Sequence, residues 1–523
     1  MTRPHYERLS ALDAAMLFME TGRTHMHIGE VGILDAGPLT TSGGLDVERI
    51  RAHVAGSLDK MPRYRQRLAF IPVEQHPVWV DDDHFNLNYH VRYTSLPSPG
   101  TARQLKRVVG RIMSQQLDLS KPLWEIWMIE GLEGGRVALM SKVHHCMVDG
   151  ISAVNALLAL FSADPDVPTH RPSPWRPRPV PSAIDLAREE LQRRAGAPLA
   201  LARSVATALA DPGPAIQAIR DALEGAVEAV AEKSRPASTT PLNVDEIGPH
   251  RRVDWIRLDL DEVKAVKNRL GGKVNDVILA IVAGAIRRYM EAHRTPVRGL
   301  DFRVVVPINR RPLSAVGELG NRVVPMLARL PLDVHDPRER LRVVAERTQA
   351  VKASKQVYAI ELFEEVSNWA DAALIAQFVR RVTRWWAGNL IVTNVPGFSF
   401  PLYFLGARLL EGYPLVPMMA NQALNVAVLS YAGGLYWGFN ADWDAITDLH
   451  DLVQCFTAEF ADLKKVAGPV TPARSHRARK GAVGAKVSDA SEPSDASSEP
   501  PAHAHVPRTT SRPQRPRNST RST

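Results

Sequence analysis

The residues with the clearest chemical potential lie in the segment 144–150, which reads HHCMVDG. Its pattern is two adjacent histidines, three spacer residues and then Asp-Gly. Histidine is partly neutral at pH 7 and is still a good proton acceptor, so an imidazole at His144 or His145 can take a proton from a hydroxyl group. Asp149 can orient the segment by pairing with a cation, and Gly150 permits a tight turn into a following helix. The segment therefore predicts general-base chemistry.

Other chemistries fit this segment less well. The chain has no GxSxG segment and no serine or cysteine in a recognised nucleophile setting, which favours direct transfer over a covalent intermediate. No metal is expected, because no HExxH or Cys/His cluster adds ligands to His144, His145 and Asp149. Cys146 is interpreted as a packed spacer. A purely structural histidine pair with a capping aspartate remains open at this point.

The elements that must position this segment follow from hydrophobic spacing. A helix capped by Thr101 is predicted before it, strands at 124–129 and 137–143 lead into it, and a helix at 152–161 follows it. In the second half, one helix ends at Gly271, another opens at Asn275 or Asp276, and the last carries an apolar stripe over 446–463. Further strands are predicted at 302–306, 389–395, 424–431 and 434–440. Strands and helices without regular βαβ alternation predict two α/β sandwiches.

Four zones divide the chain. Residues 1–165 and 246–467 are the two α/β zones. Between them, 166–245 is a connector that is first rich in proline and then helical in pattern. Residues 468–523 are rich in Ser, Pro, Ala and Arg and lack an apolar period, so they are expected to be disordered.

Composition excludes several classes of protein. The 523 residues are 45% hydrophobic, enough to bury a large core in two or three domains. Two cysteines exclude a disulfide framework and favour a reducing compartment. The net charge is 65 − 56 = +9, and the ten Lys/Arg and four Asp/Glu from residue 470 onward supply +6 of it. The body therefore carries only +3, and no nucleic-acid partner is predicted.

No membrane span is expected, because the longest apolar run, 277–286, is too short to cross a bilayer. The N-terminus has no secretory pattern. We expect a cytoplasmic protein that at most lies on the inner face of the plasma membrane or on lipid inclusions. Two segments could touch lipid: 380–386, in which three arginines flank two tryptophans, and the aromatic 398–405. Each also has an ordinary interpretation, as core in the first case and as an acyl tunnel wall in the second.

Several further segments, in order, narrow the interpretation. They are LSALDAAML (9–17), HIGEVGILD (27–35), HPVWVDDDHFNLNYHVR (76–92), PLWEIWMIEGL (122–132), PLNVDEIGPHRR (241–252), GGKVNDVILAIVAGAIRRYM (271–290), GNRVVPM (320–326) and NLIVTNVPG (389–397). Together with HHCMVDG they resemble the bacterial wax ester synthase/acyl-CoA:diacylglycerol acyltransferase family, from Leu9 to about Val466. The spacers Cys146-Met147 are bulkier than expected for the family.

This resemblance implies a fold and a reaction. The fold is two chloramphenicol-acetyltransferase-like α/β sandwich domains, joined by a partly helical connector, with the HHxxxDG loop in a channel between them. His145 would be the general base that deprotonates the acceptor hydroxyl, which then attacks the thioester of a fatty acyl-CoA. The implied partners are acyl-CoA as co-substrate and a lipid hydroxyl acceptor, either diacylglycerol or a long-chain alcohol. No bound cofactor is expected.

The resemblance also implies supporting roles, each with an alternative. His144 would hold the loop through a backbone hydrogen bond, and Asp149 would pair with Arg310. Asn275 would bind a substrate oxygen, or Asn275 or Asp276 would only cap a helix. Two further groups have a functional and a structural interpretation. The first would contact substrate or only pack the loop: Pro122, Leu123 and Trp124. The second would contact substrate or only end a strand: Asn394, Pro396 and Gly397.

Three other functions stay open. A His-x4-Asp motif starting at His144 is used by glycerol-phosphate acyltransferases, although their phosphate-binding motifs are missing here. Peptide-forming condensation domains also use HHxxxDG, although no carrier domain is encoded. A lipid-binding protein could keep the fold without turnover.

Overall fold

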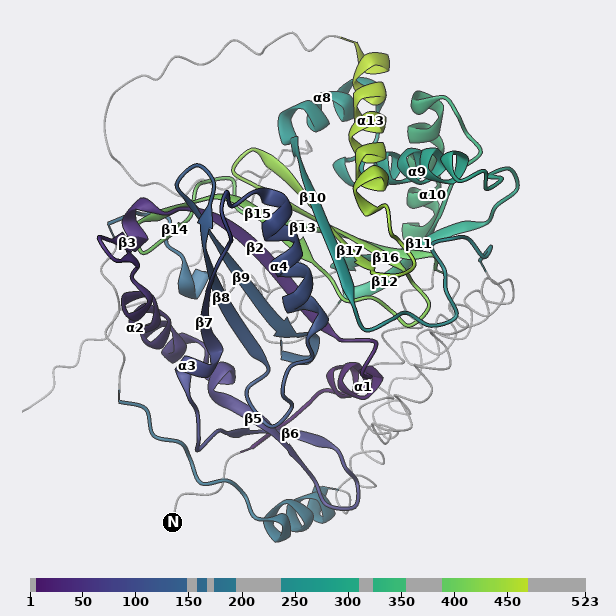
Figure 1. Ribbon diagram of the computed structural model, residues 1–523. Helices are drawn as coiled ribbons and strands as arrows, with labels where there is room; N and C mark the ends of the chain where they lie inside the picture. The colour runs from purple at the N-terminus through teal and green to yellow at the C-terminus, as the bar shows by residue number, and fades with distance from the viewer. Residues whose placement is uncertain are drawn as a thin grey trace, which may run out of the picture. The chain divides into compact units, whose positions relative to one another are not determined.

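Two six-stranded sheets organise the part of the chain that the computed structural model describes, namely residues 6–147, 158–166, 174–193, 237–309, 323–353 and 388–468. The predicted helix at 152–161 lies largely outside these ranges. The predicted connector helix, the segment 380–386 and the tail from 469 lie wholly outside them. The two sheets with their helices confirm the predicted α/β class (Figure 1).

The first sheet has the strand order β14-β15-β2-β9-β8-β7. All neighbours are antiparallel except β7 and β8. The strands are β2 (His27–Asp35), β7 (Val91–Ser95), β8 (Trp124–Leu132), β9 (Arg136–His144), β14 (Tyr403–Phe404) and β15 (Ala407–Leu415). The predicted strands at 124–129 and 137–143 are therefore confirmed, each slightly longer than expected.

The first sheet takes two strands from the second zone of the sequence. Strand β15 pairs with β2 over Gly29–Leu34, and β14 continues beyond it. This exchange was not predicted, because Gly412 and Pro414 interrupt the strand pattern of 407–415 and proline cannot donate to the ladder. The boundary between the two α/β zones therefore holds along the sequence only. In the structure, the hairpin β14-β15 of the second zone completes the sheet of the first zone.

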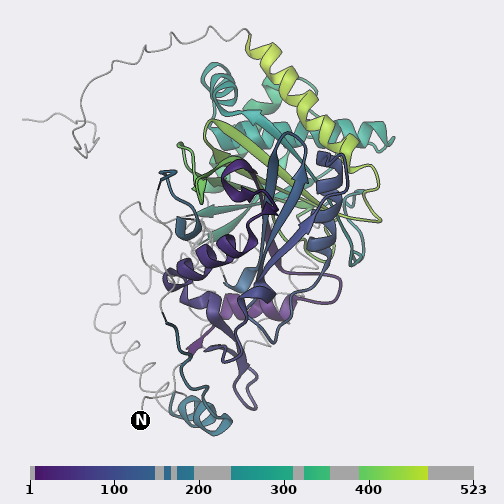
Figure 2. The ribbon, with the colours of Figure 1, turned by 60° about the vertical axis from the view of Figure 1, so that its left-hand side comes forward.

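One face of the first sheet is covered by helix α4 (Ala102–Ser114) (Figures 1 and 2). Thr101 caps this helix as predicted: its hydroxyl accepts from the backbone N–H of Gln104, whose side chain accepts from the N–H of Thr101. Lys142 of β9, fully buried, donates through Nζ to the carbonyl of Ile112 at 2.9 Å and to that of Gln115. The helix is thereby fixed to the strand that carries the histidine motif.

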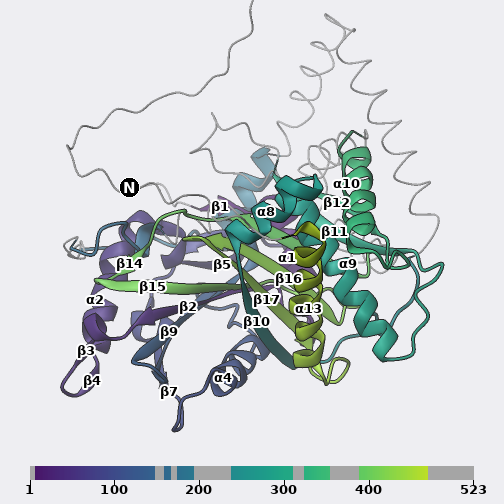
Figure 3. The same cartoon turned by 90° about the horizontal axis from the view of Figure 1, so that it is seen from above.

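The second sheet has the order β10-β17-β16-β13-β11-β12, with β13 parallel to β11 and β16. Its strands are β10 (Arg251–Asp259), β11 (Phe302–Asn309), β12 (Val323–Leu330), β13 (Leu390–Pro396), β16 (Leu424–Tyr431) and β17 (Gly434–Asp442). The covering helices are α8 (Leu260–Leu270), α9 (Val274–Ala292), α10 (Pro337–Ala353) and α13 (Leu449–Ala467) (Figure 3). Gly271 ends α8 with φ +92°, as its position predicted.

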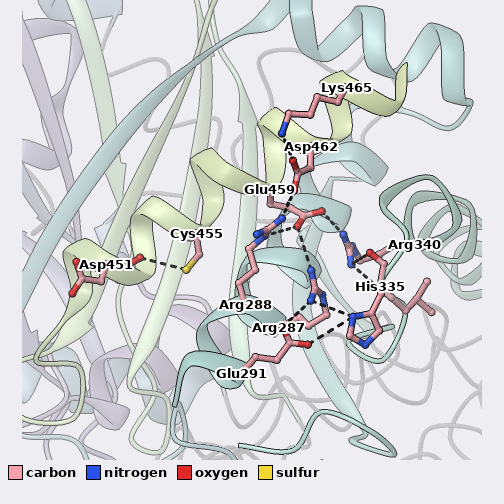
Figure 4. Close-up of polar contacts among 11 residues, drawn as sticks. Arg287, Arg288, Glu291, His335, Arg340, Asp451, Cys455, Glu459, Asp462 and Lys465 are labelled. Atoms are coloured by element: carbon pink, nitrogen blue, oxygen red, sulfur yellow. Dashed lines mark hydrogen bonds and ion pairs between the residues drawn. The ribbon is translucent and has the colours of Figure 1, made fainter. Parts of the chain in front are cut away.

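A buried ion cluster joins three of these helices (Figure 4). The Glu459 carboxylate of α13 pairs with Arg340 of α10, and both side chains are 0% exposed. Arg288 Nε of α9 donates to the same carboxylate at 3.1 Å, and Arg287 lies 4.0 Å from it. Because a buried charge is tolerated only when it is paired, these contacts fix how the helices pack.

Smaller elements complete the first half. They are helices α1 (Ala11–Met19), α2 (Val47–Ser57) and α3 (Leu87–His90), and strands β1 (Glu7–Arg8), β3 (Thr40–Thr41), β4 (Gly44–Leu45), β5 (Gln66–Phe70) and β6 (Pro77–Asp81). A further helix, 183–193, contacts the turn between β5 and β6, where Arg193 pairs with Glu74 at 3.9 Å. Within the described ranges, no helix is both long and apolar enough to cross a membrane.

Candidate active site

The histidine motif begins where β9 ends. His144 is the last residue of the strand, and His145 opens the short 3-10 helix η4 (His145–Met147). The backbone N–H of His144 donates to the carbonyl of Leu123 at 2.9 Å, and that of His145 donates to the carbonyl of Met26 at 2.7 Å. The residues before β8 and before β2 therefore hold the two histidines from both sides.

The His144 ring is fully buried and has partners at both nitrogens. The backbone N–H of Cys146 donates to Nδ1 at 3.1 Å, and the Cys146 sulfur also lies 2.9 Å from that nitrogen. Since Nδ1 accepts, Nε2 carries a proton and donates it in a hydrogen bond to the Glu20 carboxylate at 2.6 Å. With both nitrogens occupied, this ring holds the turn and is not available to a substrate.

Glu20 is a buried carboxylate between two imidazoles. Its Oε1 lies 3.4 Å from His27 Nε2, and His27 faces His144 directly across the β2–β9 ladder. Burial alone would raise the pKa of Glu20, but hydrogen bonding to His144 and His27 outweighs it and lowers this pKa to about 2. Burial lowers the pKa of His27 to about 3. The cluster therefore places one ionised carboxylate between two imidazoles, of which His27 is neutral at neutral pH.

The His145 ring differs from its neighbour in being partly exposed. Its Nδ1 is buried and has no hydrogen-bond partner within the described residues. Burial lowers its pKa below the ordinary 6.5, and nearby His144 adds to this shift. The ring is therefore neutral at pH 7, as a general base must be.

The second half of the molecule supports the same region through Arg251 of β10. Its buried guanidinium donates to the carbonyls of Gly248 at 2.6 Å and of His250 at 3.1 Å, and also to the carbonyl of Arg23. Arg23 lies in the loop between Glu20 and His27. Burial lowers the pKa of Arg251 to about 10. The loop that carries Glu20 is thus fixed to the second sheet.

The PLW residues lie beneath the motif. The side chains of Leu123 and Trp124 are buried, and Pro122 is buried with them. Trp124 Nε1 donates to the carbonyl of Tyr64 at 2.8 Å, and its ring stacks on His90 with 4.6 Å between centroids. These contacts are packing contacts, and a direct contact of PLW with substrate stays a prediction.

The ND residues have separate surroundings. Helix α9 begins at Val274, one residue earlier than predicted, and the buried Asp276 carboxylate accepts from the backbone N–H of Lys273 at 2.8 Å and from the Thr348 hydroxyl at 2.7 Å. Asp276 therefore does the capping. Asn275 is partly exposed, and within the described residues no hydrogen bond is made by its side chain. Its role as an oxygen-binding group stays a prediction.

The NVPG residues lie at the end of β13. Asn394 is partly exposed and pairs with Val428 of β16, while Pro396 ends the strand. A methyl group at Gly397 would collide with the carbonyl of Ser430, so only glycine fits this turn. Asp149, Gly150 and Arg310 lie outside the described residues.

Sequence reasoning identified the histidine pair but missed Glu20 and His27. These residues lie far from the motif along the chain, and only the β2–β9 register brings them to it. The chemical signal available was weak, since a single Glu and a single His near a helix end are common. The described residues hold no group of three or more His, Cys, Asp or Glu side chains that could bind a metal ion.

Glu20→Gln is expected to lower kcat by about 10- to 100-fold, because it replaces a charge-assisted hydrogen bond to His144 with a weaker neutral one. KM should stay near its original value, since the Glu20 side chain is buried against His144. Steady-state kinetics would check this. Glu246→Gln, which removes an exposed partner of Arg23, is the matched control. A rise in KM with unchanged kcat would contradict the positioning role.

Comparison with solved structures first defines the fold class. The starter condensation domain of rhizomide synthetase, crystallised as a variant with C8-CoA and Leu-SNAC, matches with a TM-score of 0.54 at 13% identity and covers 89% of this chain and 95% of its own. At that identity the likeness concerns the fold alone. The wax ester synthase/diacylglycerol acyltransferase from Marinobacter aquaeolei VT8 matches with a TM-score of 0.60 at 26% identity, covering 88% of this chain and 100% of its own.

Family models then define the family. The model of the wax ester synthase/diacylglycerol acyltransferase catalytic domain matches residues 9–278, and that of the C-terminal domain matches 319–464. The chain therefore belongs to the wax ester synthase/diacylglycerol acyltransferase family, which confirms the resemblance seen in the sequence. Two relatives from Mycobacterium tuberculosis strain H37Rv carry the name diacylglycerol O-acyltransferase. One is 33% identical over 479 residues (90% of this chain, 93% of the relative), and the other, tgs1, is 32% identical over 457 residues (85% and 93%).

Proposed function

We propose that this protein transfers a fatty acyl group from acyl-CoA to the hydroxyl of diacylglycerol, with long-chain alcohols as further acceptors. The observation that carries the proposal is the contrast between the two histidines. His144 is buried with both nitrogens bonded, while His145 is partly exposed and neutral. Family membership and the names of the relatives supply the substrate class.

In the proposed reaction, the proton of the neutral His145 ring is on Nδ1, and Nε2 takes the proton of the acceptor hydroxyl. The hydroxyl oxygen attacks the thioester carbonyl and forms the new C–O bond. Asn275 would donate to the developing oxyanion. The C–S bond then breaks, the proton returns from His145 to the sulfur, and CoA leaves as the thiol. The products are one ester and one free thiol, and no bound cofactor takes part.

The proposal is tested by incubating the full chain with oleoyl-CoA and, in turn, dioleoylglycerol, hexadecanol and a primary amine. We expect equal amounts of free thiol and ester with dioleoylglycerol, and ester with hexadecanol. Amide formation from the amine would instead favour the condensation reaction. No thiol release with any hydroxyl acceptor would overturn the proposal and leave a lipid-binding protein.

Such acceptors are dissolved in lipid, so we also propose that the protein works against a lipid surface. The helix at 183–193 supports this, because its exposed side carries two large apolar side chains beside Arg188: Ile184 is 79% exposed and Leu191 is 70% exposed. Ala187 lies between them on the same face. Apolar side chains of this size usually lie in the core, so a lipid bilayer is a suitable partner for this face.

Replacing Ile184 and Leu191 together by aspartate is expected to weaken sedimentation with vesicles that contain dioleoylglycerol by at least about tenfold, since burying each side chain stabilises by about 1.5–3 kcal/mol. Gln192→Asp is the matched control, because it adds a charge to the same helix and removes no apolar area. Equal sedimentation of all three proteins would show that this face does not meet the lipid.

A further inference from the structure

The two central strands of the first sheet present a partly exposed face. On it lie Ile28 and Glu30 of β2 and Ser141 and Val143 of β9, whereas the residues between them are buried against α4. Ser141 and Val143 lie two residues apart on this face, because side chains alternate along a strand. The strand ends at His144, so the face reaches the end of β9, where His145 follows.

Glu30 is an ionisable residue on this face, and its carboxyl group has no partner within the described parts of the chain. Directly across from it are Ser141 on β9 and Pro414 on β15, neither of which carries a charge. Lys142, the adjacent cation, points to the opposite face and bonds the end of α4. Among the described residues, no hydrogen bond or ion pair involves the Glu30 carboxyl group. Burial raises its pKa to about 7.

Glycine and leucine residues shape the space around this carboxyl group. A methyl group at Gly412 of β15 would lie 3.4 Å from Glu30 Oε1 and 3.4 Å from Leu429 Cδ2 of β16. A methyl group at Gly397 would lie 3.0 Å from Leu429 Cδ1. The Glu30 side chain thus extends across β15 toward the second sheet, where a leucine separates it from the NVPG turn. A polar group in such surroundings is costly unless it gains a partner.

The position of Glu30 suits a substrate that reacts at His145. Glu30 lies three residues along β2 from His27, which is level with His144, so the separation along the strand is about 10 Å at ~3.3 Å per residue. An extended substrate whose reacting atoms lie at His145 can therefore place a second polar group beside Glu30.

We propose that Glu30 is a substrate-binding residue that donates a hydrogen bond to a carbonyl oxygen of one of the two substrates. The inference rests on the proposed function for the identity of those substrates. A carbonyl oxygen of this kind occurs in two sources, the ester groups of a glyceride acceptor and the amide groups of the CoA arm. A simple long-chain alcohol has none, so Glu30 would favour substrates that carry the carbonyl.

The test measures equilibrium binding, which does not depend on turnover. Dissociation constants are determined for palmitoyl-CoA, 1,2-dioctanoylglycerol and decanol with the original protein, Glu30→Ala and Glu30→Gln. We expect Glu30→Ala to weaken the binding of one carbonyl ligand by about five- to tenfold and to leave decanol unchanged. Glu30→Gln keeps a donor and should stay within about threefold of the original protein. Glu133→Ala, in an exposed turn, is the control.

The outcomes separate the possibilities. Weaker binding of dioctanoylglycerol alone identifies the glyceride ester, and weaker binding of palmitoyl-CoA alone identifies the CoA amide. Unchanged affinity for all three ligands overturns the proposal, and so does equal weakening of all three with a lowered melting temperature, which would indicate a structural role. If the original protein binds these ligands but forms no ester, the proposed function fails. The binding measurements would then still show whether Glu30 contacts a carbonyl ligand.

Discussion

His145→Ala is expected to lower kcat/KM for ester formation by about 10²- to 10⁴-fold while the protein stays folded. The methyl group cannot take the proton of the acceptor hydroxyl, so the alcohol must attack without a base. The fold should survive, because the backbone N–H of residue 145 keeps its bond to the Met26 carbonyl and the supporting contacts belong to His144. Release of free CoA thiol with oleoyl-CoA and dioleoylglycerol measures the loss.

The same base sets the pH dependence of the reaction. A base must be unprotonated, and the pKa of His145 is lowered from 6.5, chiefly by burial. Activity should therefore persist as the pH falls through 6.5 and decline only below it, as the ring takes up a proton. Measuring kcat/KM from pH 5 to 9 would show this acid limb. An acid limb above pH 7 would contradict a base that is neutral at pH 7.

The matched control is His84→Ala, since His84 is 92% exposed and lies on the surface of the same half. It should retain full activity. If His145→Ala kept substantial turnover with an unchanged melting temperature, His145 would be removed from the base role. If it instead unfolded, His145→Gln would serve, because an amide side chain of similar length occupies the site and cannot accept the proton at neutral pH.

Local patterns predicted much of the fold. The Thr101 cap, the Gly271 helix end and the strand at 424–431 were read correctly, since each depends on neighbouring residues alone. The exchange of β15 into the first sheet could not be read in this way. Its strand contains Gly412 and Pro414, and what stabilises it is pairing with β2, almost 400 residues earlier in the chain.

In the candidate site too, the sequence predicts local features but not those that depend on tertiary contacts. The adjacent histidines were visible because they are neighbours in sequence, but the difference between them was not. That difference comes from Glu20 reaching His144, and from burial that only the β2–β9 pairing creates. Similarly, the sequence left open whether Asn275 binds an oxygen or whether Asn275 or Asp276 only caps the helix. The backbone N–H of Lys273 donates to Asp276, which makes the aspartate the capping residue, and the Thr348 hydroxyl of α10 bonds its other oxygen in a tertiary contact that the sequence does not show.

Glu459→Ala is expected to lower the free energy of unfolding by about 3–5 kcal/mol, since it leaves the buried Arg340 without its counter-charge. Arg340 is fully buried and would lose the carboxylate that faces it, while Arg288 would lose its bond at 3.1 Å (Figure 4). Helices α9, α10 and α13 meet at this carboxylate, so no single helix can move to restore a partner. Urea unfolding followed by tryptophan fluorescence measures the change.

Glu346→Ala provides the comparison, because it removes an ion-pair partner of Arg342 within α10 that is 59% exposed. Water can solvate an exposed partner, so this change should leave the urea midpoint nearly unaltered. If both variants shifted the urea midpoint equally, burial would not explain the contribution of the Glu459 cluster to stability. Glu459→Gln adds a finer test: it keeps the shape of the side chain and removes only its charge. A loss close to that of the alanine variant would assign the effect to the charge rather than to the volume.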